Sequence, residues 1–94
     1  MRNMDAETIK LIRDIDERKR IINDYRYCRI LDRDHVIKLI VEKRQEDPKV
    51  FFITRATQFG KTLSPLEEAP DEILIQELQL QVVAMEGEVV EKMR

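Results

Sequence analysis

The stretch PDEILIQELQLQVVAMEGEVVEK, residues 70–92, decides the fold of this chain. A proline followed by two acids is typical of a helix start, because proline tolerates the first turn and acids meet the positive end of the helix dipole. Apolar residues then recur at alternating spacings of three and four, which places them on one helix face. They are Ile75, Leu78, Val82, Met85 and Val89. We expect this face to form the core or a self-association seam.

This segment is more apolar than a one-sided helix needs. Ile73, Leu74, Leu80 and Val83 widen the stripe, and such a helix is normally buried on more than one side. The alternation over residues 77–83 also fits a strand, but the longer periodicity favours a helix. Gly87 weakens the last turns by about 1 kcal/mol. The pattern predicts further helices packed around this one, in an oligomer.

A second helix is predicted over about residues 5–31. Asp5 is placed as its N-cap, and apolar residues return at helical spacing through Leu11, Ile15 and Tyr25. Opposite charges four residues apart, such as Asp14 and Arg18, support a helix with a solvated face.

The apolar stripe is interrupted at Arg29, Asp32 and Arg33 and resumes out of phase at Val36. We therefore expect a break and a further helix over about 34–45, capped by Asp32 or Asp34. One continuous bent helix is the alternative, since no glycine or proline precedes residue 48.

Residues 49–57 are rich in β-branched and aromatic side chains, which predicts a short β segment. A linking loop over 61–70 would lead into the C-terminal helix. The expected fold is therefore mainly α: a single small domain, 1–94, of three amphipathic helices (5–31, 34–45, 70–92) and one short strand, assembled as an oligomer.

Composition narrows the function classes. The chain is 38% charged with a net charge of −2, and it holds one cysteine and one histidine. No cysteine or histidine set suits a metal, and no carboxylate pair or nucleophile motif stands out, so we predict no metal, no cofactor and no enzyme activity. The first residues lack a signal peptide and no apolar run reaches membrane-spanning length, which favours the cytoplasm.

Residues 55–62, RATQFGKT, match a phosphate-binding loop except at its first glycine. Arg55 stands where the backbone must approach the phosphate closely, and Pro65 prevents the helix that should follow. The motif therefore favours a basic turn after a strand, from which Arg55, Lys61 and Thr62 would contact a partner or an anion.

Tyr25, Arg26, Arg29 and Arg33 form a second candidate constellation. Such residues suit a phosphate backbone or a nucleotide, but interleaved aspartates favour a salt-bridged surface, and the acidic chain disfavours nucleic acid as a partner. Cys28 lies near the apolar stripe and is expected to be buried. His35 is expected in the first turn of the second helix.

The sequence favours a non-catalytic protein–protein interaction module, such as an inhibitor, adaptor or assembly factor, acting as a helical oligomer. Its compact, charged character is typical of regulators carried by phages or mobile elements. The alternative is a protein that binds or sequesters a nucleotide or anion between subunits. A third reading is a helix-turn-helix-like DNA-binding regulator built around residues 31–34.

Overall fold

The computed structural model describes residues 5–46 and 66–94, which form three α-helices and one short 3-10 helix. They are α1 (Ala6–Tyr27), α2 (Arg33–Glu46), η2 (Leu66–Glu68) and α4 (Asp71–Lys92). The fold is mainly helical, as predicted, and the alternation over 77–83 belongs to a helix. No strand occurs among the described residues. The predicted strand 49–57 and the part of the linking loop before residue 66 lie outside them.

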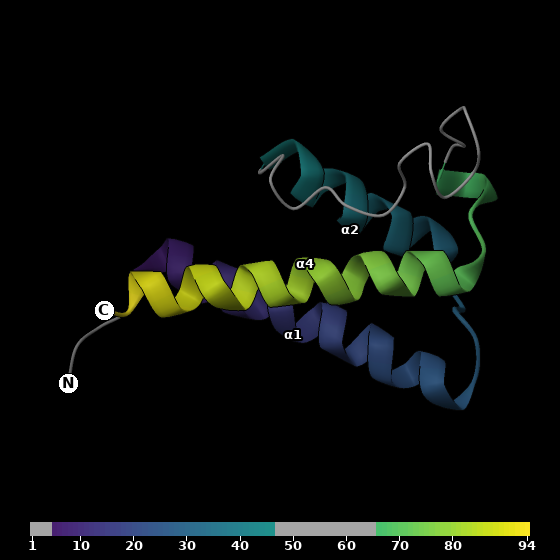
Figure 1. The fold of residues 1–94 in the computed structure, drawn as a ribbon, viewed down its shortest axis with the longest axis horizontal. Coiled ribbons are helices and arrows are strands. Elements are labelled where there is room, and N and C mark those ends of the chain that lie inside the picture. The colour runs from purple at the N-terminus through teal and green to yellow at the C-terminus, as the bar shows by residue number, and fades with distance from the viewer. Residues whose placement is uncertain (1–4, 47–65) are drawn as a thin grey trace.

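α4 is the central element of the fold (Figure 1). It runs antiparallel to α1: Lys92 pairs with Glu7 at one end, and Glu72 meets Tyr25 at the other. α2 packs on another side of α4 and runs in the same direction, since Arg33 pairs with Asp71 near the helix starts and Lys43 pairs with Glu88 near the helix ends. The helix with the most apolar sequence is therefore covered from two sides.

The helix ends follow local capping chemistry. The Asp5 carboxylate accepts a hydrogen bond from the Thr8 N–H at 2.7 Å, and this bond lowers the pKa of Asp5. Asp32 caps α2 in the same way, through the His35 N–H at 3.0 Å. α4 begins at Asp71, so Pro70 is its N-cap rather than a first-turn residue.

α1 ends four residues earlier than the expected boundary at 31, because the backbone turns away at Cys28 with φ −151° and ψ −142°. The turn releases Ile30 from the helix and lets it enter the core, where it is 8% exposed. The alternative of one continuous helix over 5–45 is therefore wrong. The break stabilises the fold because it buries the side chain of Ile30.

The predicted apolar face of α4 forms the core of this single chain. Leu78 and Met85 are fully buried, and Ile75 and Val82 are at most 7% exposed. Towards its start, α4 packs with Ile40 of α2; towards its end, Val82 and Met85 pack with Leu11 and Ile15 of α1.

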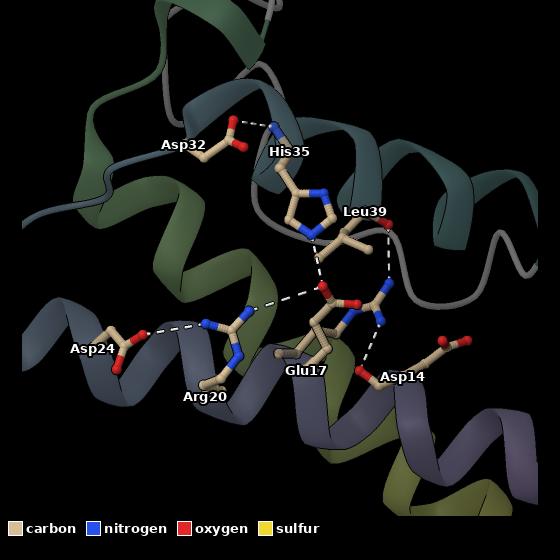
Figure 2. Close-up of polar contacts among 8 residues, drawn as sticks. Asp14, Glu17, Arg20, Asp24, Asp32, His35 and Leu39 are labelled. Carbon is tan, nitrogen blue, oxygen red and sulfur yellow. Dashed lines mark hydrogen bonds and ion pairs between the residues drawn. The ribbon is translucent and has the colours of Figure 1, made fainter.

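A buried arginine links all three α-helices. Arg18 of α1 is 3% exposed, and its Nε donates to Gln81 Oε1 of α4 at 3.0 Å. Its terminal nitrogens donate to the carbonyl oxygens of Asp14 and Leu39, each at 3.0 Å, as the dashed lines to Asp14 and Leu39 show in Figure 2. Gln81 in turn donates to the Ile40 carbonyl at 3.1 Å. Burial lowers the pKa of Arg18, which still carries its charge at neutral pH.

Two ion pairs extend this polar layer between α2 and α4. Arg44 lies 3.1 Å from Glu77, whose side chain is fully buried, and Lys43 lies 3.5 Å from Glu88. The inward face of α4 thus carries Glu77 and Gln81 among its aliphatic side chains, and each of them is matched by a group on a neighbouring helix.

Replacing Arg18 with leucine should lower the free energy of unfolding by about 3 kcal/mol, because Gln81 and the Leu39 carbonyl lose a charged donor in a site closed to water. Urea denaturation measures the loss. Replacing Gln81 with leucine as well should restore part of the stability, because no buried amide is then left without its donor. Arg13→Leu, at an exposed position of the same helix, is the matched control. A loss from Arg18→Leu no larger than that of the control would contradict a structural role for the network.

Candidate functional site

The connection between α1 and α2 forms a corner with an unusual distribution of apolar residues. Ile30 is 8% exposed, whereas Tyr27 and Leu31 on either side of it are each 83% exposed. The short connection, fixed at one end by the Cys28 N–H bond to the Asp24 carbonyl and at the other by the Asp32 cap, cannot bury all three. Two large apolar side chains therefore project from this corner.

A hollow of about 390 Å³ opens beside these side chains. Its apolar lining comes from both helices and from the connection, through Ile21, Tyr27, Ile30, Leu31 and Val36. Arg20, Asp24, Arg29 and His35 are among its polar lining residues. We call Arg26, Tyr27, Arg29, Leu31 and this hollow the corner surface.

Most polar groups of the hollow are already engaged with each other (Figure 2). His35 Nε2 lies 2.7 Å from Glu17 Oε2, and the same carboxylate oxygen lies 4.0 Å from Arg20. Arg20 also pairs with Asp24 at 3.3 Å. This chain of contacts from α2 to α1 holds the charges along one wall of the hollow.

The arginines of the predicted constellation, Arg26, Arg29 and Arg33, divide into two groups with different roles. Arg33 is held by structure: it pairs with Asp71 and donates to the carbonyl oxygens of Glu67 and Ala69, at 3.1 and 2.8 Å. Arg26 and Arg29 are exposed and form no ion pair with any residue of 5–46 or 66–94. Of the three arginines in the constellation, Arg26 and Arg29 therefore remain available to a partner.

Tyr25 is half-buried against the core, and its hydroxyl donates to Glu72 at 3.0 Å. This hydrogen bond raises the pKa of the Tyr25 hydroxyl, since loss of the proton would place two negative charges together. Tyr25 thus ties α1 to α4, and the neighbouring Tyr27 is the tyrosine that faces solvent.

Cys28 is exposed, so the expectation of a buried cysteine is wrong. It lies at the C-cap of α1, where the chain leaves the helix and the apolar stripe no longer points to the core. Its Sγ lies 3.4 Å from the Arg29 carbonyl oxygen. Cys28 and His35 both line the hollow, but the His35 ring is directed to Glu17.

Arg55, Lys61 and Thr62 lie outside the described residues, so their predicted contacts stay predictions. Of the residues predicted for self-association, Ile75, Leu78, Val82 and Met85 are buried within one chain, and Val89 is partly buried beside Met85. Self-association through these five residues also stays a prediction, and it would need their side chains to leave the core.

Within 5–46 and 66–94, no group of three or more His, Cys, Asp or Glu side chains is arranged to hold a metal ion. No helix in that part of the chain combines the length and apolarity that a membrane span needs.

Sequence reasoning missed Leu31 and the hollow. A signal was present, because Leu31 is an apolar residue inside the break, between Arg29 and Asp32, where the helical stripe has lost its phase. Helical periodicity does not predict on which side such a residue lies. Its exposure depends on which of the neighbouring side chains packs into the core.

Comparison with protein-family models, with curated proteins and with solved structures finds no match to this chain. The functional assignment therefore rests on the residues and their geometry.

Two arginines of one predicted cluster should respond differently to truncation. Arg33→Ala should lower the free energy of unfolding by about 1–2 kcal/mol, because two carbonyl oxygens and the Asp71 carboxylate lose their donor. Arg29→Ala should leave the free energy of unfolding unchanged, since the Arg29 side chain forms no ion pair with any residue of 5–46 or 66–94. Chemical denaturation of both variants checks this, and equal effects would contradict the division between structural and available arginines.

Proposed function

We propose that this protein is a non-catalytic protein-binding module whose contact region is the corner surface. The observation that carries the proposal is the 83% exposure of both Tyr27 and Leu31 beside an apolar hollow. Large apolar side chains at a helix corner are costly to leave in water, and aromatic and aliphatic groups beside a pocket are typical of interaction hot spots. Burying each on a partner would contribute about 1.5–3 kcal/mol.

The available charges indicate the chemistry of the partner. Arg26 and Arg29 are exposed cations beside Tyr27, while Asp24 is neutralised by Arg20. A peptide segment with an apolar side chain for the hollow and acidic residues beside it would meet both features. Arginine also forms two parallel hydrogen bonds with a carboxylate, which adds geometric specificity.

The three-helix core would serve as the rigid support for this surface. Arg18, Tyr25 and Arg33 fix the helices around the corner, so the connection is presented without a large loss of entropy on binding. A binding surface on such a rigid scaffold would suit an inhibitor, an adaptor or an assembly factor. The exposed single cysteine suits a reducing compartment such as the cytoplasm.

A displayed library of random peptides tests the proposal. We expect selected peptides to share an apolar residue flanked by Asp or Glu, and to lose at least about tenfold in affinity for the Tyr27→Ser/Leu31→Ser variant. That variant should unfold at the same urea concentration as the wild type, because both side chains lie in solvent. Ile9→Ser, which changes an exposed apolar residue elsewhere on α1, is the matched control. Selected peptides that bind the double variant as tightly as the wild type would contradict the proposal.

A nucleotide is the second candidate ligand, favoured by the presence of Tyr27 and Arg29 on the same hollow. The ring would stack on the base and the guanidinium would meet a phosphate. A thermal-shift screen against mono-, di- and cyclic nucleotides tests it. Stabilisation that disappears in Arg29→Ala would favour the nucleotide, and a flat response across the panel would exclude it at the concentrations used.

A further inference from the structure

Between Ile73 and Met85 the outer face of α4 carries no exposed charge, in a chain whose residues are 38% charged. Between Ile73 and Met85 the only charged residue is Glu77, and its side chain is fully buried. Solvent on this stretch therefore meets Gln76, Gln79 and the aliphatic Val83. The exposed positions of α1, by contrast, include Lys10, Arg13, Asp16 and Arg20.

Apolar and small residues line this face at helical spacing. We define the outer stripe of α4 as the positions that repeat at spacings of four and three opposite the core: Gln76, Leu80, Val83, Gly87 and Val90. Val83 is 67% exposed and Val90 is 54% exposed. This stripe is distinct from the buried face of α4, which is occupied by α1 and α2.

Gly87 supplies an independent observation. A glycine inside a helix costs about 1 kcal/mol relative to alanine. A Cβ at Gly87 would meet no atom within 4 Å, so packing within the chain does not require a glycine here. The missing side chain leaves a notch in the outer stripe, and a notch of this kind permits close approach of another helix.

We propose that two copies of the chain pair antiparallel through the outer stripes of their α4 helices, about a two-fold axis that passes between Val83 and Ala84. In this register Leu80 lies over the partner's Gly87, and the same contact recurs on the other side of the axis. Val83 lies over the partner's Ala84. Leu80 of each copy would therefore fill the notch at the partner's Gly87.

Charge favours a second copy in this orientation over other occupants. An acidic partner helix would find no positive charge between Gln76 and Val90, and a basic one would find Glu86 and Glu88 already paired with Lys19 and Lys43. A second copy in antiparallel orientation sets its uncharged half, before Glu86, against the acidic half of its partner without repulsion. The antiparallel register places Gln76 beside the partner's Glu91, an amide donor beside a carboxylate. A parallel register would instead bring Glu86 and Glu91 towards their own counterparts, which is unfavourable.

The predicted dimer is weak, because a single pair of 22-residue helices forms a small interface. Association in the micromolar range is therefore expected. The dimer leaves the corner surface outside the contact, so each assembly would present two of these surfaces, and the two proposals can fail independently.

Sedimentation velocity from low micromolar to near-millimolar protein tests the assembly. We expect a monomer–dimer equilibrium for the wild type and a monomer throughout for Val83→Lys, whose exposed position should leave the unfolding curve unchanged. Leu31→Lys is the matched control: it places the same charge on another exposed apolar position, in the corner surface, and should dimerise as the wild type does. A monomeric wild type at every concentration, or a dimer that survives Val83→Lys, would overturn the proposal.

Gly87→Ala separates the effect on folding from the effect on assembly. The alanine should raise the melting temperature of the monomer, because the helix gains propensity and nothing nearby clashes. It should weaken the dimer about tenfold, because the new Cβ meets the partner's Leu80. A variant that gains stability without losing dimer affinity would contradict the close approach at residue 87.

Disulfide trapping in a Cys28→Ser background distinguishes the two orientations. Val83→Cys lies next to the two-fold axis and should crosslink efficiently under mild oxidation. Gln76→Cys should not, because the antiparallel register separates it from its own counterpart by roughly 22 Å along the helix axis. Equal crosslinking at both positions would indicate a parallel pair and refute the proposed register.

Discussion

The three helices are held in register by one buried guanidinium. Arg18 donates to a carbonyl of its own helix, to the Leu39 carbonyl of α2 and to Gln81 of α4, and Gln81 continues to the Ile40 carbonyl. Aliphatic side chains pack in many similar ways, whereas these hydrogen bonds are satisfied in only one relative position of the helices. Displacing α2 by one turn would remove the Leu39 acceptor from Arg18 and the Ile40 acceptor from Gln81, which leaves two buried N–H groups without partners.

The position of α2 determines what the corner can present. Once Ile40 and Leu39 are fixed against Gln81 and Arg18, Val36 lies in the core and the Asp32 cap is set one turn earlier. The connection must then reach from Tyr27 to Asp32, and the core accepts Ile30. Tyr27 and Leu31 are left outside because of this geometry, so the exposed pair of the proposed binding surface is a consequence of the polar network at the centre of the bundle.

Sequence patterns predicted the elements of this structure better than their polar contacts. The helix start at Asp5, the cap at Asp32 and the buried face of α4 depend on spacing and local chemistry, which a sequence displays directly. Arg18 was assigned to a solvated face because Asp14 lies four residues before it, yet it contacts the Asp14 carbonyl and points inward. Arg33 was assigned to a partner-binding constellation, yet it pairs with Asp71 and donates to the Glu67 and Ala69 carbonyls. Whether a polar side chain is engaged within the chain depends on acceptors supplied by segments distant in sequence. The hollow arises from the same tertiary contacts and has no local pattern.

α4 also inverts the usual arrangement of an amphipathic helix at two points. Glu77 and Gln81 face inward with no exposed surface, while Val83 and Val90 face outward. The polar residues inside are explained by Arg44 and by the Arg18 network, so they satisfy requirements within the chain. The apolar residues outside satisfy none within 5–46 and 66–94, and Gly87 beside them lowers helix stability without relieving any contact in that part of the chain. The proposed antiparallel pair would make both features favourable, because it covers the exposed valines and sets Leu80 of one copy against Gly87 of the other.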